Sequence, residues 1–134
     1  MNEGLIRRLQ KIQNWAAKLI YKQSKYTHVT PLLNTLHWLP IVKRIEFKVL
    51  IFVHGCIYNT TPTYMSELIT TKNYTRDTRQ SENITLLVPK TNISYGSRAF
   101  SVIGPRLWNS LPNYLTSVTT KPLFKSKLKT YLFQ

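Results

Sequence analysis

Residues 40–57 restrict the fold more than any other segment, because apolar side chains surround most of the helix that they would form. Pro40 is well suited to open that helix. The wider apolar face is made of Ile41, Val42, Ile45, Val49, Phe52, Val53 and Cys56. A helix of this kind is typically the buried centre of a helical domain. We therefore expect a packed Phe52, an inert buried thiol at Cys56, and His54 at a polar edge.

Shorter patterns predict further helices. Residues 5–22 carry an apolar stripe at helical spacing, which we expect to face the core. That stripe is Leu5, Leu9, Ile12, Ala16, Leu19 and Ile20. Thr30-Pro31 and Thr61-Pro62 are helix-start signals for two short helices. A helical turn is expected at 106–111, and a last helix from about 120–122 to the C-terminus, with Phe124, Leu128, Tyr131 and Leu132 as its stripe.

The second half also contains strand signals. Residues 85–88 and 99–102 are plausible strands, Gly96 is a turn residue between them, and Gly104-Pro105 should interrupt the chain. Polar residues without a period at 70–83 predict an exposed linker. The expected fold is therefore a mainly α, small single domain with a short β-hairpin in its second half. Its helical part covers about 4–69, its linker about 70–83, and its hairpin and terminal helix about 84–134.

The charge balance points to an anionic partner. Nineteen Lys and Arg face five Asp and Glu, a formal net charge of +14. Nucleic acid is the commonest partner of such a surface, an anionic membrane is next, and a merely solvated basic surface is the plain alternative. The longest apolar stretch, 49–53, is too short to span a bilayer, and no secretory signal is visible. We expect an intracellular protein, nuclear or cytoplasmic, without a membrane partner. The oligomeric state stays open.

Two sets of basic residues are the candidate phosphate contacts. Arg7, Lys11, Lys18 and Lys22 repeat at intervals of four, seven and four, which predicts one cationic side of the first helix. Trp15 lies at its edge and is a candidate for stacking on bases. The second set is Lys125, Lys127 and Lys129. Trp38 and Trp108 are expected to fill the core.

Catalytic chemistry has no visible residues. Two-metal catalysis needs converging carboxylates, but Asp77 is the only Asp and no acidic pair occurs. His28, His37, His54 and Cys56 lack the paired spacing of a zinc site. The four glycines form no phosphate-binding loop. We expect no cofactor, no metal, and neither polymerase nor nuclease activity.

Short motifs occur along the chain in a distinctive order. Residues 9–17 read LQKIQNWAA, 28–33 HVTPLL, 36–40 LHWLP, 44–48 RIEFK, 62–68 PTYMSEL, 95–102 YGSRAFSV, 104–112 GPRLWNSLP and 124–133 FKSKLKTYLF. In this order they resemble the C-terminal segment of LINE-type (non-LTR) retrotransposon reverse transcriptases. The resemblance covers nearly the whole chain. It implies a position downstream of the fingers, palm and thumb of an RNA-directed DNA polymerase.

The resemblance implies a transposable element that copies its own RNA into DNA at a nicked chromosomal target. The family's Y-x-D-D palm motif is not in this sequence, and no catalytic residue is carried over. The implied role is accessory: holding template RNA or target DNA through basic helices. One alternative is a structural module that packs on the upstream polymerase thumb, with incidental charge. Another is a non-functional remnant of a truncated element.

Overall fold

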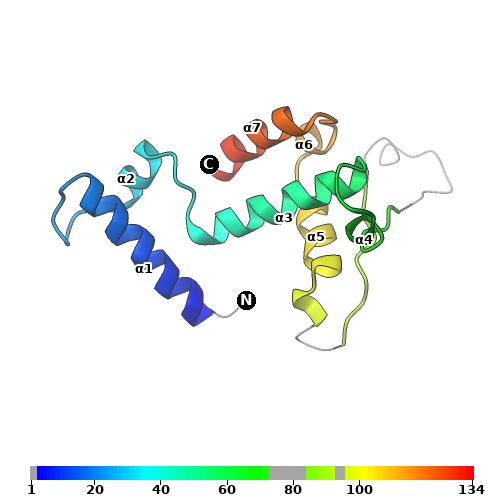
Figure 1. Ribbon diagram of the computed structural model, residues 1–134, viewed down its shortest axis with the longest axis horizontal. Coiled ribbons are helices and arrows are strands. Elements are labelled where there is room, and N and C mark those ends of the chain that lie inside the picture. The colour runs from blue at the N-terminus through cyan, green and yellow to red at the C-terminus, as the bar shows by residue number, and fades with distance from the viewer. Residues whose placement is uncertain (1–2, 73–83, 93–95) are drawn as a thin grey trace. The chain divides into compact units, whose positions relative to one another are not determined.

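The computed structural model describes residues 3–72, 84–92 and 96–134 (Figure 1). The chain divides into two compact units. Unit 1 contains residues 1–46 together with 132–134, and unit 2 contains residues 47–131. The described residues are mainly helical, as predicted. None of their helices combines the length and apolarity needed to cross a membrane.

Unit 1 begins with the predicted amphipathic helix, α1 (Glu3–Ile20). Its end is a Schellman motif, in which the Lys22 N–H donates to the Leu19 carbonyl and the Gln23 N–H donates to the Lys18 carbonyl. Lys22 has a left-handed φ of 50°. The helix therefore ends two residues before the predicted boundary, and Lys22 no longer continues its spiral.

The second helix of unit 1, α2 (Thr30–Thr35), contacts α1. Pro31 is in its first turn as predicted, although Thr30 is helical and Val29 takes the N-cap position. The helix ends where His37 adopts a φ of 52°. The ring of His37 then meets the edge of Phe133, which joins the C-terminal residues to this unit.

Amide side chains form hydrogen bonds between α1 and the segment after α2. The Gln13 side chain donates to the Leu39 carbonyl at 2.9 Å, and the Ile41 N–H donates to the Gln10 side-chain oxygen at 2.9 Å. Gln10 also donates to Gln13 and to Asn14. We call Gln10, Gln13 and Asn14 the amide clamp. It satisfies backbone groups that α1 would otherwise cover, and it fixes the side of α1 that faces the rest of unit 1.

Helix α3 (Ile41–Ile57) matches the predicted long helix, but its buried side differs from the predicted one. The buried residues are Leu50, Val53, His54, Gly55 and Cys56. Phe52 is 44% exposed, so the prediction of a packed Phe52 is wrong. Phe52 lies about 200° around the helix from Leu50, and a pattern that is apolar on nearly all sides cannot say which side packs. The burial of Cys56 is confirmed.

The core of unit 2 is aromatic. The ring of His54 stacks on Phe124, with centroids 4.3 Å apart, and Trp108 lies 5.8 Å from Phe124. All three side chains are fully buried. They come from α3, α5 (Phe100–Asn109) and α7 (Lys121–Leu132), so a single cluster joins the three longest helices that contribute to this unit. The prediction of a buried Trp108 is confirmed, whereas the prediction of His54 at a polar edge is wrong.

The predicted β-hairpin is not formed by the described residues. Residues 99–102 belong to the start of α5 instead of a strand, after the short 3₁₀ helix η1 (Gly96–Arg98). Leu86 forms only an isolated antiparallel bridge with Thr71. The Asn109 side chain bonds both the N–H and the carbonyl of Leu86, at 2.9 and 2.8 Å. The Trp108 indole donates to the Ile84 carbonyl, so side chains take the place of the missing strand partner.

Gly104 and Pro105 lie inside α5 and do not interrupt it. Pro105 removes one helical hydrogen bond, but its ring is buried in the core. A Cβ at Gly104 would lie 2.8 Å from the Cγ2 of Val53, so only glycine allows this approach of α5 to α3. Packing therefore explains the pair of residues that local sequence rules read as a chain break.

The remaining elements are short or terminal. Helix α4 (Thr63–Ser66) follows Pro62 as predicted, and α6 (Asn113–Thr116) was not predicted. The apolar stripe of α7 is confirmed, with Phe124, Leu128 and Leu132 buried and Tyr131 half-buried. Most of the predicted linker at 70–83 lies outside the described residues. Its first residues, 70–72, are exposed, and they pair with 85–87 through the bridge and its hydrogen bonds.

Candidate nucleic-acid interface

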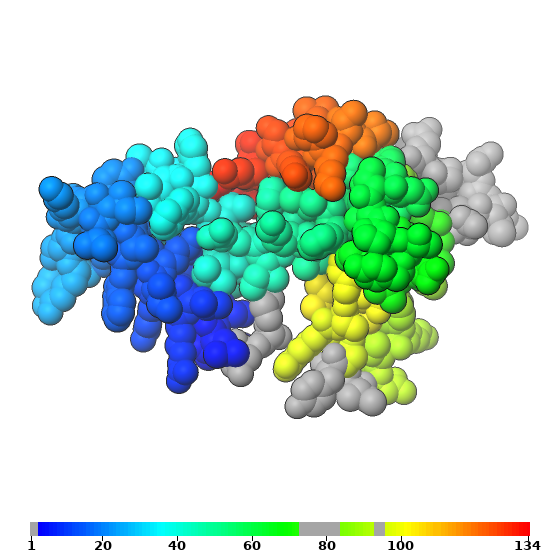
Figure 2. Space-filling view, in the orientation of Figure 1, coloured from blue at the N-terminus to red at the C-terminus, as the bar shows by residue number. Residues whose placement is uncertain are grey.

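Helix α1 has three distinct sides, and the amide clamp decides which one is buried. Gln13 and Ala17 are buried, and Ile6 and Gln10 are half-buried beside them. Arg7 and Lys11 are exposed on the neighbouring side, as predicted. In the space-filling view the side chains of α1, in blue, project outward from the helix (Figure 2). The basic side is therefore presented to solvent by a helix that is fixed on its other side.

The four predicted cations of this region do not form one uniform row. Lys18 is half-buried, and its ammonium donates to the Lys25 carbonyl. Lys22 belongs to the turn after the helix. Arg7 faces Glu3 at 3.9 Å, and both side chains are highly exposed. An exposed pair of this kind contributes roughly 0–1 kcal/mol, so Arg7 can exchange this partner for a phosphate at little cost.

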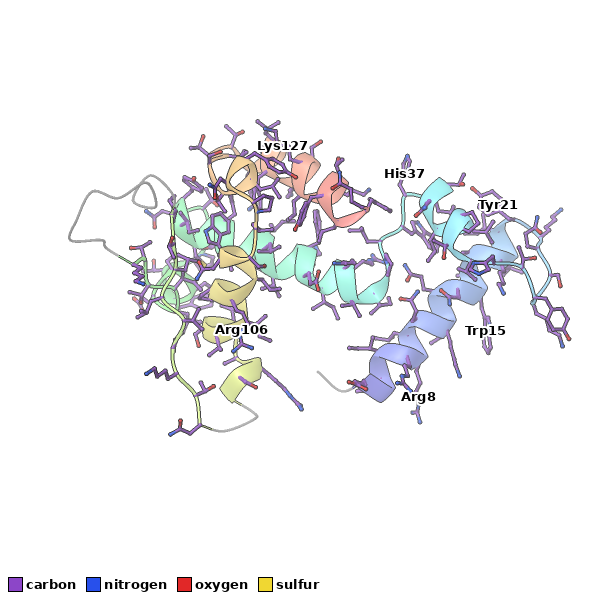
Figure 3. All side chains as sticks on the ribbon, turned by 180° about the vertical axis from the view of Figure 1, so that it is seen from behind. Arg8, Trp15, Tyr21, His37, Arg106 and Lys127 are labelled. Atoms are coloured by element: carbon purple, nitrogen blue, oxygen red, sulfur yellow. The ribbon has the colours of Figure 1, made fainter. Side chains whose placement is uncertain are left out.

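The sequence analysis missed Arg8, which is also exposed. Arg8 and Trp15 are seven residues apart, a spacing that places them within about 20° on a helix. Their side chains leave the same side of α1 (Figure 3). The signal is present in the sequence, but on the helix Arg8 lies between Trp15 and the apolar stripe, outside the predicted row of cations.

The three tryptophans separate clearly. Trp15 is 70% exposed, Trp38 is half-buried and Trp108 is fully buried. The preference for Trp15 as the binding tryptophan therefore agrees with its exposure. Burying an aromatic side chain of this size is favourable by roughly 1.5–3 kcal/mol of free energy. Because Trp15 is exposed, it does not contribute this free energy to the stability of the chain.

The apolar stripe of α1 is exposed, which contradicts its predicted place against the core. Apart from the half-buried Ala16, each of its residues is at least half exposed: Leu5, Leu9, Ile12, Leu19 and Ile20. The physical reason is the amide clamp, because Gln10 and Gln13 occupy the inward side and turn the leucines away from it. A row of this length marks an interaction surface more often than ordinary surface.

The turn after α1 carries a further exposed aromatic ring next to a cation. Lys18 holds this turn through the Lys25 carbonyl. The ammonium of Lys25 lies 5.0 Å from the centroid of the Tyr26 ring, within the range of a cation–π contact. Tyr26 is 85% exposed. Lys18, Lys25 and Tyr26 are thus linked by successive contacts.

The second predicted basic set lies on α7, where Lys125, Lys127 and Lys129 are all exposed. Lys125 and Lys129 are about one turn apart, while Lys127 lies about 160–200° around the helix from them. Lys127 points outward from the helix (Figure 3). These lysines flank the buried stripe of α7 on both sides and do not form one row. They belong to unit 2, and the N-terminal set belongs to unit 1.

Among the titratable groups of the described residues, His54 is fully buried. No group of three or more His, Cys, Asp and Glu side chains in this part of the chain could hold a metal ion. Asp77 lies outside the described residues. The His54 Nε2–H donates to the Val118 carbonyl at 2.9 Å, which leaves a buried Nδ1 without a partner. Burial lowers the pKa of His54, Lys121 lowers it further, and the bond to Val118 partly opposes this.

The His54 ring is therefore a part of the aromatic core of unit 2. Tyr58, whose ring lies 4.6 Å from that of His54, has its pKa raised by burial. Both effects follow from packing in unit 2 and give no sign of a catalytic pair.

Among known protein families, curated proteins and solved structures, the comparisons find no match to this chain.

Proposed function

We propose that this chain is a non-catalytic accessory part of a LINE-type retrotransposon polyprotein, and that it binds RNA or DNA without sequence preference. The family assignment rests on the ordered motifs of the sequence. The binding role rests on one structural observation: Arg7, Arg8 and Lys11 are exposed on α1, whose inward side is bonded to Leu39 and Ile41.

The geometry of α1 suits a run of phosphates. From Arg7 to Lys18 the helix rises about 16 Å, the axial length over which one strand of B-DNA carries about five phosphates. The backbone of these cations is already ordered in the helix, so binding has to order only their side chains. Contacts to phosphates alone carry no base information, so the expected binding is independent of sequence.

A comparison of two charge-matched variants tests the proposal. One replaces Arg7, Arg8 and Lys11 by Gln, and the other replaces Lys125, Lys127 and Lys129 by Gln. Both lower the net charge by three, so they reduce long-range attraction equally. Affinity for unrelated duplexes is measured by fluorescence anisotropy over a range of salt concentrations. The α1 variant should lower the log–log salt slope by about three, because each phosphate that is no longer neutralised removes roughly 0.9 from it.

Circular dichroism of both variants checks that the helices remain, because Gln is a fair helix former. The α7 variant should lose less affinity than the α1 variant. Equal losses in the two variants would mean that net charge, and not α1, is responsible for binding. A folded wild-type chain with no salt-dependent affinity would remove the proposal altogether.

The exposed apolar stripe of α1 supports a second candidate function, a module that packs on the polymerase thumb. Leu5, Leu9, Ile12, Leu19 and Ile20 could be covered by such a partner. Mixing the chain with a separately purified thumb domain of a LINE-type polymerase tests this. Co-elution that is lost on replacing Ile12 and Leu19 by Gln would support docking, and co-elution that depends only on the lysines would contradict it.

A further inference from the structure

We infer that unit 1 binds single-stranded nucleic acid, with bases stacked on the exposed rings of Trp15 and Tyr26 between the cations of α1 and of the following turn. This inference rests on the proposed nucleic-acid binding and adds the form of the ligand. The rings are the new element, because cations alone recognise the phosphates of single and double strands alike.

Trp15 carries an exposed ring on a backbone that the helix holds in place. It lies in the middle of α1, where a side chain has few rotamers. Its neighbours on the helix are Lys11 and Lys18, about one turn before and after it, and Arg8 two turns before it. A flat aromatic surface beside positive charges is what a base with its attached phosphate requires.

Contacts in the turn after α1 connect Tyr26 to the last turn of this helix. The Lys18 ammonium donates to the Lys25 carbonyl, so this lysine links the helix to the turn. Lys25 in turn lies 5.0 Å from the centroid of the Tyr26 ring. Trp15 and Lys18 are neighbours on the helix. The helical spacing of Trp15 and Lys18, the hydrogen bond from Lys18 to Lys25 and the contact of Lys25 with Tyr26 together give the order ring, cation, cation, ring.

Single strands fit this order better than duplexes do. In a duplex the faces of the bases are covered by their neighbours, so a protein ring can reach them only by unstacking a step at a cost of a few kcal/mol. In a single strand the faces are free, and stacking of each base on an aromatic ring is favourable without regard to sequence. An anionic membrane is the competing ligand, because Trp15 borders the apolar stripe. Tyr26 argues against it, since its ring lies against Lys25 in the turn after α1 and is not part of the apolar stripe.

The test compares an oligothymidylate with a duplex of the same phosphate count, using the full chain. Trp15→Leu keeps an apolar side chain but removes the aromatic face. It should weaken binding of the oligothymidylate about tenfold and binding of the duplex clearly less. Trp15→Phe should restore most of the loss. Tyr26→Leu should have the same effect, whereas Tyr64→Leu, an exposed tyrosine of unit 2, serves as the matched control and should change neither affinity.

Tryptophan fluorescence provides a second readout. Oligothymidylate should quench the emission of the wild-type chain, and the quenching should disappear in Trp15→Phe although binding remains. Salt-dependent binding of both nucleic acids that Trp15→Leu weakens equally, or not at all, would overturn the inference and leave the proposed function standing. No binding of either would overturn both. Binding only to vesicles of phosphatidylserine and phosphatidylcholine, weakened in Trp15→Leu, would assign this side of α1 to a membrane instead.

Discussion

Unit 1 is stabilised internally by one kind of contact, and unit 2 by another. In unit 2 the rings of His54, Trp108 and Phe124 are fully buried, and the amide of Asn109 completes the hydrogen bonds of an extended segment beside them. In unit 1 the amide clamp takes the inward side of α1, and the apolar stripe faces outward. Unit 2 therefore buries an aromatic cluster in its own core, whereas unit 1 leaves the apolar stripe of α1 exposed.

This difference bears on where binding energy is available. Burial of large apolar side chains supplies most of the stability of a small unit, while each neutral hydrogen bond adds only about 0.5–1.5 kcal/mol net. The amide clamp fixes the orientation of α1 without using its leucines or Trp15. A region that is oriented by polar contacts and keeps apolar and aromatic groups exposed has the properties of a binding surface. The following experiments test this contrast, beginning with the largest expected effect.

The aromatic core of unit 2 should give the largest loss of stability. Phe124→Ala removes a fully buried ring that stacks on His54, and we expect the free energy of unfolding to fall by about 3–5 kcal/mol. Phe52→Ala, on the exposed side of α3, is the matched control and should cost much less. Urea unfolding followed by circular dichroism measures both. Equal losses would mean that the stability of unit 2 does not depend on this cluster.

The Asn109 contact should have an intermediate effect. Asn109→Ala removes both hydrogen bonds to Leu86 and leaves its backbone N–H and carbonyl without these partners. A loss of about 1–3 kcal/mol is expected for such partly buried groups. Asn113→Ala, an exposed asparagine at the start of α6, is the control. Hydrogen exchange at the Leu86 amide should accelerate in the first variant alone. A protected Leu86 amide in Asn109→Ala would show that its protection does not depend on the bond to Asn109.

Acid should destabilise the chain through His54. Because burial lowers the pKa of His54 below 6.5, the unfolded chain binds a proton in mild acid that the folded chain does not. The contribution of His54 is complete above pH 6.5 and decreases as the pH falls below it, by at most about 1.4 kcal/mol per pH unit. Urea unfolding at successive pH values measures the slope. His54→Phe should reduce the slope, and His37→Asn, at an exposed histidine, should retain it.

The smallest effect is expected on the outward stripe of α1. Leu19 is 80% exposed, so Leu19→Gln should change the free energy of unfolding by no more than about 0.5 kcal/mol. Leu128→Gln, at a fully buried position of α7, places an amide in the core and should be severely destabilising. Thermal unfolding of the two variants gives the comparison. A large loss in Leu19→Gln would show that this leucine packs within the chain.

Much of the helical pattern was predictable from local signals. The bounds of α3, the proline in the first turn of α2, and the stripe of α7 follow from periodicity and helix-start residues. The exposure of Trp15 and the burial of Trp108 also matched expectation. The position of Lys22 did not match expectation. It has a left-handed φ at the end of α1, where glycine or asparagine is usual and a lysine does not indicate such a conformation. Arg8 was not predicted because it lies outside the row that the other cations of α1 form.

The remaining differences depend on contacts between residues far apart in the chain. No local rule predicts that Gln13 will bond the carbonyl of Leu39, yet that contact decides which side of α1 is buried. The missing hairpin has a similar origin, because Asn109 and Trp108 satisfy the backbone of 84–86 from a helix. Local rules predict a helix break at Gly104, whereas in the structure this glycine allows the close approach of Val53.

The sequence by itself determined that the chain is helical, strongly basic and without a visible set of catalytic ligands. Periodicity and composition are local or summed properties, and they survive any arrangement of the helices. Only the tertiary structure decided which side of each helix packs, because that choice depends on the partner available at a particular distance and angle. For α3 the partner is an aromatic cluster, and for α1 it is a pair of backbone groups that amides can reach and leucines cannot satisfy.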